Sequence, residues 1–214
     1  MSTRQVDSST GVATEPGAQS RPARGGARVV TGWYRTPWGM GTLGVSEGSL
    51  VGVELPGAPA SAHPEEPALR GGSRAAPPCS HEPPTADRSA LDRWVGELEA
   101  YFRGERLSWR PEEIELDSLG LGPFERVVYT TLLSVPPAVT VSYGVLAEMA
   151  GYPRAARAVG NAMAANPIPV VVPCHRVIRA DGTLGNYGHD PAWKGRLLTH
   201  EQTHVPAVER GKGR

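Results

Sequence analysis

The chain has 214 residues and carries 22 basic and 22 acidic side chains, so its formal net charge is zero. This length allows one ordinary domain or two small ones, which can bury a core without disulfide bonds. A neutral total argues against a protein held on nucleic acid by bulk charge. Residues 151–180, however, contain four arginines and no acidic side chain, which predicts a local basic patch.

The two cysteines, Cys79 and Cys174, are expected to be free thiols. Cys79 lies in a proline-rich stretch, so a disulfide would tie a loop to a core element, and free thiols suit a reducing compartment. Residues 1–19 are polar, which predicts no signal peptide, and no apolar stretch of 18 residues is present for a membrane span. We therefore expect a soluble intracellular protein.

The N-terminal half predicts a small α/β domain over residues 28–118, preceded by a disordered tail over residues 1–27. Short apolar segments between residues 29 and 55 predict an antiparallel sheet, with the hairpin turn at Ser46-Glu47-Gly48-Ser49. The proline content of residues 56–88 predicts a flexible insertion. Ser89 is then expected to cap a helix that reaches Phe102 and covers one face of the sheet.

The C-terminal half predicts a second, mainly helical domain over residues 119–204, followed by a flexible tail over residues 205–214. Pro123 stands at a first-turn position and is expected to open an amphipathic helix, which Pro136-Pro137 closes. The fold class expected for the whole chain is therefore α/β in the α+β sense.

Two short helices with the spacing of a helix-turn-helix follow. Ser142 is expected to cap the first, and Pro153 to start the second, which runs to about residue 165. An ordinary helical hairpin is the alternative. The second helix carries mostly small side chains, because alanine and glycine dominate it, while Arg154 and Arg157 project from it. This composition favours a helix that enters a nucleic-acid groove.

The segment Pro173-Cys174-His175-Arg176-Val177 carries the candidate chemistry. The β-branched residues 170–172 predict a buried strand that leads into it. A single cysteine in an apolar run is usually a small core side chain, but His175, Arg176 and Arg179 would favour ionisation of this thiol. Adjacent residues of a strand point to opposite faces, so His175 needs a bend or a bridging water to act on Cys174.

This segment resembles the active-site signature of the methylated-DNA-protein-cysteine methyltransferases, also called alkylguanine DNA alkyltransferases. The resemblance covers residues 124–201 through motifs in series: Val141-Ser142-Tyr143-Gly144, Arg154-Ala155-Ala156-Arg157-Ala158-Val159-Gly160, Asn166-Pro167, Gly185-Asn186-Tyr187 and Leu197-Leu198-Thr199-His200-Glu201. The N-terminal half matches more loosely, through Thr36-Pro37-Trp38-Gly39 and Tyr101-Phe102-Arg103-Gly104. The resemblance as a whole implies a ribonuclease-H-like N-terminal domain and a winged-helix-like C-terminal domain.

The resemblance also implies a reaction. The thiolate of Cys174 would attack the alkyl carbon on guanine O6, leaving a stable thioether, so that each molecule acts once and needs no cofactor. His175 would act as base through a water, and Glu201 would orient the imidazole. Tyr143 would assist rotation of the nucleotide and protonate the leaving base at N3.

The implied partner is double-stranded DNA that carries an alkylated guanine, bound through its minor groove by a monomer in the bacterial cytoplasm, at the nucleoid during repair. Arg157 would enter the base stack after the nucleotide is flipped out. Further DNA-binding positions are implied at Ser142, Arg154, Ala156 and Gly160. Asn166 would brace the reactive segment, and the support and pocket residues would be Val172, Pro173, Arg176, Val177, Tyr187 and Gly188.

Two departures from the family pattern concern the pocket and a possible metal. Gly188-His189-Asp190-Pro191 stands where the family has a small, glycine-rich stretch, which predicts a stiffer loop and bears on the size of the adducts accepted. Some relatives use an N-terminal zinc, but His63, Cys79 and His81 do not form a four-ligand set at the usual spacing. No structural metal is expected.

Three other functions compete with alkyl transfer. A damage sensor of the same fold would bind alkylguanine without reacting, but such relatives lack the cysteine. A thiol hydrolase would use Cys174 and His175 with turnover. A transcription regulator would prefer one DNA sequence, which the alanine-rich helix disfavours.

Overall fold

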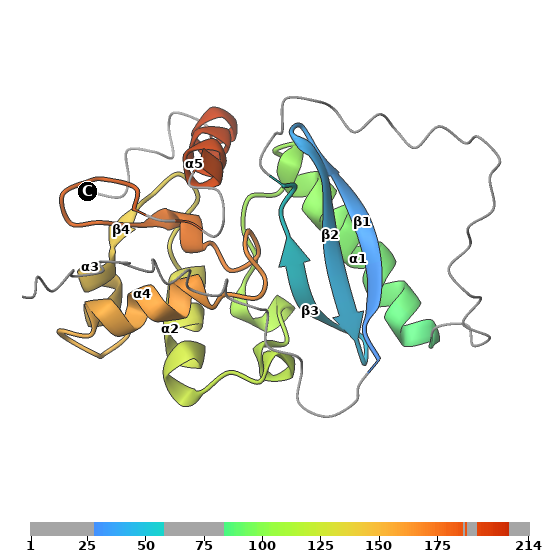
Figure 1. Ribbon diagram of the computed structural model, residues 1–214, viewed down its shortest axis with the longest axis horizontal. Helices are drawn as coiled ribbons and strands as arrows, with labels where there is room; N and C mark the ends of the chain where they lie inside the picture. The colour runs from blue at the N-terminus through green and yellow to red at the C-terminus, as the bar shows by residue number, and fades with distance from the viewer. Residues whose placement is uncertain (1–27, 58–83, 186, 188–191, 206–214) are drawn as a thin grey trace, which may run out of the picture.

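The computed structural model of the chain describes residues 28–57, 84–185, 187 and 192–205 (Figure 1). The expectations for residues 1–27, for most of the 56–88 insertion and for nearly all of the C-terminal tail lie outside the described residues. So do those for His63, Cys79, His81 and Gly188.

The N-terminal part is a three-stranded antiparallel sheet in the order β1-β2-β3, formed by Val30–Thr36, Gly39–Ser46 and Ser49–Glu54. The turn between β2 and β3 contains Glu47 at φ 52° and Gly48 at φ 78°. Two positive φ values in a two-residue loop match the twist of paired strands. The expected hairpin turn is confirmed.

Helix α1 (Thr85–Phe102) covers one face of this sheet, and Trp94, Leu98 and Tyr101 are buried in the shared core. The expected cap at Ser89 is wrong, because the helix begins at Thr85. The Asp87 carboxylate accepts a hydrogen bond of 2.7 Å from the amide of Gly48, which fixes the first turn of the helix to the hairpin. Residues 85–88 are therefore helical and do not belong to the insertion.

The remaining elements follow in chain order. Two 3-10 turns, η1 (Pro111–Glu113) and η2 (Leu116–Leu119), lead into helices α2 (Pro123–Leu133), α3 (Tyr143–Met149) and α4 (Ala156–Ala164). Strand β4 (Val141–Ser142) pairs in parallel with β5 (Val177–Ile178). The 3-10 turn η3 (Cys174–Arg176) precedes β5, and α5 (Ala192–His204) ends the described chain. Helix α2 opens at Pro123, as the sequence predicts.

The helix-turn-helix is formed by α3 and α4, which pack against each other. The Ser142 hydroxyl accepts a hydrogen bond of 3.1 Å from the amide of Val145, which confirms the expected cap of α3. Helix α4 begins at Ala156 and not at Pro153, because Arg154 takes a left-handed conformation at φ 71° that no helix can contain. Arg154 thus lies in the turn, and Arg157 lies in the exposed first turn of α4.

The strand expected over residues 170–172 is wrong. These valines are buried, but they form tight turns with one isolated bridge between Pro169 and Val172. Val170 has a φ of 76°, a strained value for a β-branched residue. Pro169 and Pro173 carry no amide hydrogen, so this segment cannot form a regular ladder.

The sheet with α1 and the helices α2, α3 and α4 form two halves of the molecule (Figure 1). Hydrogen bonds join the sheet part to the C-terminal part: the amide of Val53 donates to the carbonyl of Pro167 at 2.8 Å, and the side-chain indole of Trp193 on α5 donates to the carbonyl of Pro56 at 3.0 Å. In the described part of the chain, no helix has both the length and the apolar composition needed to cross a membrane.

Removing the cap of α3 should weaken the helix-turn-helix. We expect Ser142→Ala to lower the free energy of unfolding by about 1 kcal/mol, because the amide of Val145 loses its acceptor. Chemical denaturation followed by circular dichroism measures this change. Ser118→Ala, which removes an exposed hydroxyl from η2, is the control. An equal loss in both variants would contradict the capping role.

Candidate active site

Cys174 opens the turn η3 and is buried. Its sulfur accepts a hydrogen bond of 3.1 Å from the side-chain amide of Asn166, and its thiol donates to the Tyr187 hydroxyl at 3.6 Å. The Asn166 amide also donates to the carbonyl of Val172 at 2.9 Å, while its oxygen accepts from the amide of Ile168 at 3.1 Å. Asn166 therefore holds both the loop and the sulfur.

The thiol of Cys174 is in its neutral form at rest. Burial raises its pKa, and the hydrogen bonds that the sulfur forms with Asn166 and Tyr187, together with the charge of Lys194, oppose this only in part. The expectation that arginines activate the thiol is wrong: Arg176 turns toward Glu201, and Arg179 is exposed. The positive charge of Lys194 lowers the pKa of the thiol.

His175 is fully buried, and its Nε2 lies 2.8 Å from Oε1 of Glu201. Because an ionised carboxylate only accepts hydrogen bonds, Nε2 carries the proton, and Nδ1 of a neutral ring then offers a lone pair. This Nδ1 has no hydrogen-bond partner among the described residues. Burial lowers the pKa of His175 despite Glu201, so the ring is neutral and can accept a proton at Nδ1.

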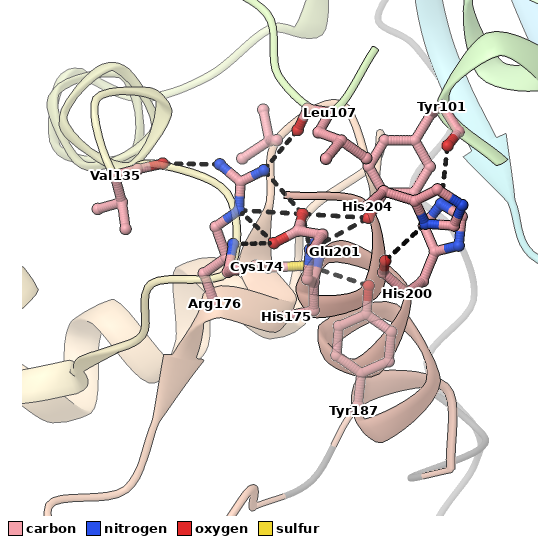
Figure 2. A network of polar contacts seen from close by, with 12 residues as sticks. Tyr101, Leu107, Val135, Cys174, His175, Arg176, Tyr187, His200, Glu201 and His204 are labelled. Carbon is pink, nitrogen blue, oxygen red and sulfur yellow. Dashed lines mark hydrogen bonds and ion pairs between the residues drawn. The ribbon is translucent and has the colours of Figure 1, made fainter. Parts of the chain in front are cut away.

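The carboxylate of Glu201 is the centre of a buried polar network (Figure 2). Arg176 donates to it from Nε at 3.1 Å and from a terminal nitrogen at 2.7 Å, and the amide of Ala138 donates to Oε2 at 2.8 Å. The same guanidinium donates to the carbonyls of Val135 and Leu107 at 2.7 and 2.6 Å. Burial alone would raise the pKa of Glu201, but His175 and Arg176 hold it well below its usual range.

Tyr143 and Lys194 form a second polar pair near the sulfur. Nζ of Lys194 donates to the Tyr143 hydroxyl at 3.4 Å and lies 5.6 Å from the ring centroid. Burial raises the pKa of Tyr143 and lowers that of Lys194. Because Lys194 occupies a lone pair of the hydroxyl oxygen, the hydroxyl hydrogen is available to a third group.

The structure brings most of the expected site residues together. Those gathered around Cys174 are His175, Arg176, Asn166, Tyr187 and Glu201, with Val172, Pro173 and Val177 buried beside them. Arg154 and Arg157 are exposed on the helix-turn-helix. Ala156 and Gly160 are half-buried on α4, where a Cβ on Gly160 would lie 4.0 Å from the Tyr143 ring.

Sequence reasoning missed three groups in the network. Lys194 lies between two of the matched motifs and belongs to neither, and the amide of Ala138 gave no signal, since any residue except proline supplies one. Tyr101 contacts Glu201 across 100 positions of sequence, which no local pattern reveals. Its motif, Tyr101-Phe102-Arg103-Gly104, pointed only to a helix end. Over the described ranges, no group of three or more side chains is arranged to hold a metal ion.

The fold and the site are those expected of a DNA-binding protein with a reactive thiol, because a helix-turn-helix stands beside a buried cysteine that is followed by a histidine hydrogen-bonded to a carboxylate. The comparisons narrow this class. The family model described as "6-O-methylguanine DNA methyltransferase, DNA binding domain" matches residues 123–203. A methylated-DNA-protein-cysteine methyltransferase of Mycobacterium tuberculosis is 44% identical over 123 residues, which are 58% of this chain and 72% of that protein.

A mouse methylated-DNA-protein-cysteine methyltransferase is 37% identical over 178 residues, 78% of each chain. The crystal structure of Mycobacterium tuberculosis OGT in complex with DNA has a TM-score of 0.58 and 34% identity, covering 83% of this chain and 95% of that one. The chain belongs to the methylated-DNA-protein-cysteine methyltransferase family. This membership confirms the resemblance drawn from the sequence and the expected α+β fold class.

The buried carboxylate of Glu201 should make the free energy of unfolding depend on pH in the acid range. A carboxylate whose folded-state pKa lies below its unfolded value of about 4.3 stabilises the fold fully above that value, and the contribution is lost as the pH falls. We expect Glu201→Gln to lower the free energy of unfolding at neutral pH by about 3 to 5 kcal/mol, because Arg176 loses its counter-charge.

The variant should also show a flatter decline of stability between about pH 5 and pH 3. Urea denaturation at a series of pH values measures both effects. Glu148→Gln, which changes an exposed glutamate of α3, is the matched control. If Glu201→Gln and the native protein declined in parallel, the carboxylate would not be the group that titrates.

Proposed function

We propose that this protein repairs DNA by direct reversal, transferring an alkyl group from guanine O6 to Cys174. The sulfur forms a bond to the alkyl carbon while the bond between that carbon and O6 breaks. The thiol proton passes to Nδ1 of His175 through a water, and the electron pair of the broken bond leaves with the guanine. The product is a thioether, so each molecule reacts once and the reaction uses no cofactor.

The observation on which this proposal rests is the buried Nδ1 of His175, which has no hydrogen-bond partner in the described chain and belongs to the residue that follows Cys174. Nε2 of His175 is hydrogen-bonded to Glu201, while Nδ1 is buried and its lone pair has no protein partner in the described chain. A neutral imidazole in this state accepts a proton, and Glu201 then stabilises the imidazolium. A cysteine that served only as a core side chain would have no use for this arrangement.

The helix-turn-helix supports DNA as the substrate. Arg154 and Arg157 are exposed on it, and residues 151–180 contain no acidic side chain that would repel phosphates. The small residues Ala156 and Gly160 allow close approach of a backbone, as the narrow minor groove demands. Within this proposal, Ser142 and these residues contact the duplex, and Arg157 enters the stack in place of the flipped nucleotide.

Tyr143 is proposed to deliver a proton to the departing base. Its hydroxyl keeps its hydrogen because burial raises its pKa, and Lys194 binds the oxygen from the other side. As guanine leaves with extra negative charge, protonation at N3 stabilises it. Tyr187, Val172, Pro173 and Val177 then line or support the pocket for the extruded base.

Two further features belong to the proposal. All groups of the site come from one chain, so a monomer suffices for transfer. Because the proposed substrate is DNA, we expect the protein to act at the nucleoid, in the cytoplasm. A sensor that binds without reacting would not need Cys174, and a thiol hydrolase would turn over repeatedly, so a single experiment separates these functions.

The decisive measurement is the intact mass of the protein after incubation with a duplex that carries O6-methylguanine. We expect one methyl group for each protein molecule, located at Cys174 by peptide mapping, and no further turnover. Cys174→Ser should keep DNA binding and gain no methyl group, since a hydroxyl is a far weaker nucleophile. Binding without methyl gain by the native protein would indicate a sensor, and repeated ester or amide cleavage a hydrolase.

The role of Arg157 gives a separate prediction. Flipping a nucleotide costs roughly a few kcal/mol, and a side chain that fills the gap offsets part of this cost. We therefore expect Arg157→Ala to slow single-turnover transfer by about tenfold or more on a paired duplex. Arg110→Ala, which removes an exposed arginine from the N-terminal half, should leave the rate unchanged.

The defect should shrink on single-stranded DNA, where the base is already unpaired and extrusion costs less. A phosphate contact would behave differently, because its loss weakens binding to all DNA and lowers the salt dependence of the binding constant. An equal defect on paired and single-stranded substrates would exclude the stack-filling role of Arg157.

A further inference from the structure

Tyr101 lies near the end of α1, in the half of the molecule that carries the sheet, yet it reaches the active-site network. Its side chain is fully buried. The ring stacks on Trp109 with centroids 6.0 Å apart, and the imidazole of His200 lies 5.3 Å away on another side. Packing of this kind leaves the ring one orientation, so the position of its hydroxyl is fixed.

The hydroxyl of Tyr101 donates to Oε1 of Glu201 at 3.1 Å and lies 3.5 Å from Nε2 of His175 (Figure 2). The same Oε1 accepts from His175 at 2.8 Å, so the hydroxyl and the imidazole share one acceptor. The main-chain carbonyl of Tyr101 accepts a hydrogen bond of 2.8 Å from Nε2 of His200, the neighbour of Glu201 on α5. Tyr101 is thus attached to α5 at both ends.

The hydroxyl is a permanent donor. Burial and the nearby charge of Glu201 keep the pKa of Tyr101 well above its usual range, so the group never ionises at physiological pH. A donor hydrogen-bonded to a carboxylate stabilises its negative charge and weakens its hold on a neighbouring cation. The neighbour that shares this oxygen is His175.

We infer that Tyr101 is a positioning residue of the alkyl-transfer reaction: by donating to Oε1 of Glu201, its hydroxyl keeps His175 unprotonated and ready to act as base. The inference rests on the proposed function. It assigns the N-terminal half a part in the chemistry, because α1 supplies the hydroxyl. Without this hydroxyl, Glu201 would attract the imidazolium more strongly, and a larger fraction of His175 would be protonated before the reaction.

Several other charged or titratable groups face His175, and they are the same with or without the hydroxyl. From α5 they are Glu201 and Lys194, and from η3 they are Arg176 and Cys174, whose thiol is hydrogen-bonded to Tyr187 of the loop before α5. Lys194 and Arg176 oppose protonation of His175, whereas Glu201 favours it. Removing only the oxygen of Tyr101 therefore isolates one contribution to the balance.

The test compares the native protein with Tyr101→Phe, which keeps the ring and its packing. The first measurement is the pH titration of the His175 imidazole by NMR with labelled histidine, assigned through its absence from a His175→Ala variant. We expect the midpoint to rise by about half to one pH unit in Tyr101→Phe. An unchanged or lowered midpoint overturns the inference, whatever the activity.

The second measurement is the pH profile of single-turnover methyl transfer from O6-methylguanine DNA. A base that is protonated more readily loses rate on the acid side, so Tyr101→Phe should be about threefold to tenfold slower at pH values below the midpoint of the native His175 titration and approach the native rate near pH 9. The final extent of methylation reports the fraction of protein molecules that are folded and active, and in Tyr101→Phe it should stay at one methyl group for each protein molecule.

Tyr34→Phe is the matched control. Tyr34 is equally buried in the same half, and its hydroxyl donates at 3.0 Å to the main-chain carbonyl of Glu54. It should leave both the titration and the rate profile unchanged. A uniform slowing at every pH in Tyr101→Phe would show a purely structural role and overturn the inference. If the native protein transferred no methyl group, the proposed function would fail, and the NMR titration would still decide the role of Tyr101.

Discussion

The buried carboxylate of Glu201 is the group around which the site is organised. An isolated carboxylate in the interior is costly, so each of its oxygens needs donors in fixed positions. They come from separate parts of the chain: Tyr101 on α1, the amide of Ala138 after α2, and His175 with Arg176 on η3. The contacts that satisfy this charge therefore also hold the turn that carries Cys174.

The same arrangement separates the structural charges from the reacting atoms. Glu201 and Arg176 form a buried ion pair, whereas the thiol of Cys174 and the imidazole of His175 are neutral at rest. Because the thiolate is the nucleophilic form, a neutral thiol reacts little with stray electrophiles. In the proposed reaction the thiol becomes nucleophilic only as its proton passes through a water to His175, which suits a protein that reacts once.

Much of this protein can be predicted from its sequence where a signal is local. The hairpin at Gly48, the cap at Ser142 and the helix that opens at Pro123 follow from short-range rules and are confirmed. Where contacts between residues distant in sequence decide the structure, these short-range rules gave wrong predictions. Asp87 extends α1 back to Thr85 by bonding to a distant turn, and the valines at residues 170–172 are buried without forming a strand, because flanking prolines remove the donors that a ladder needs.

The sequence by itself identified the candidate reactive residues and the candidate DNA-binding helix, because Cys174 with His175 and the alanine-rich, basic helix each form a contiguous motif. Only the tertiary structure decided how these residues are charged. Whether a buried thiol or imidazole is neutral depends on burial and on groups such as Lys194, Tyr101 and the amide of Ala138. These lie far away in the chain, and only folding brings them within hydrogen-bonding or Coulomb range.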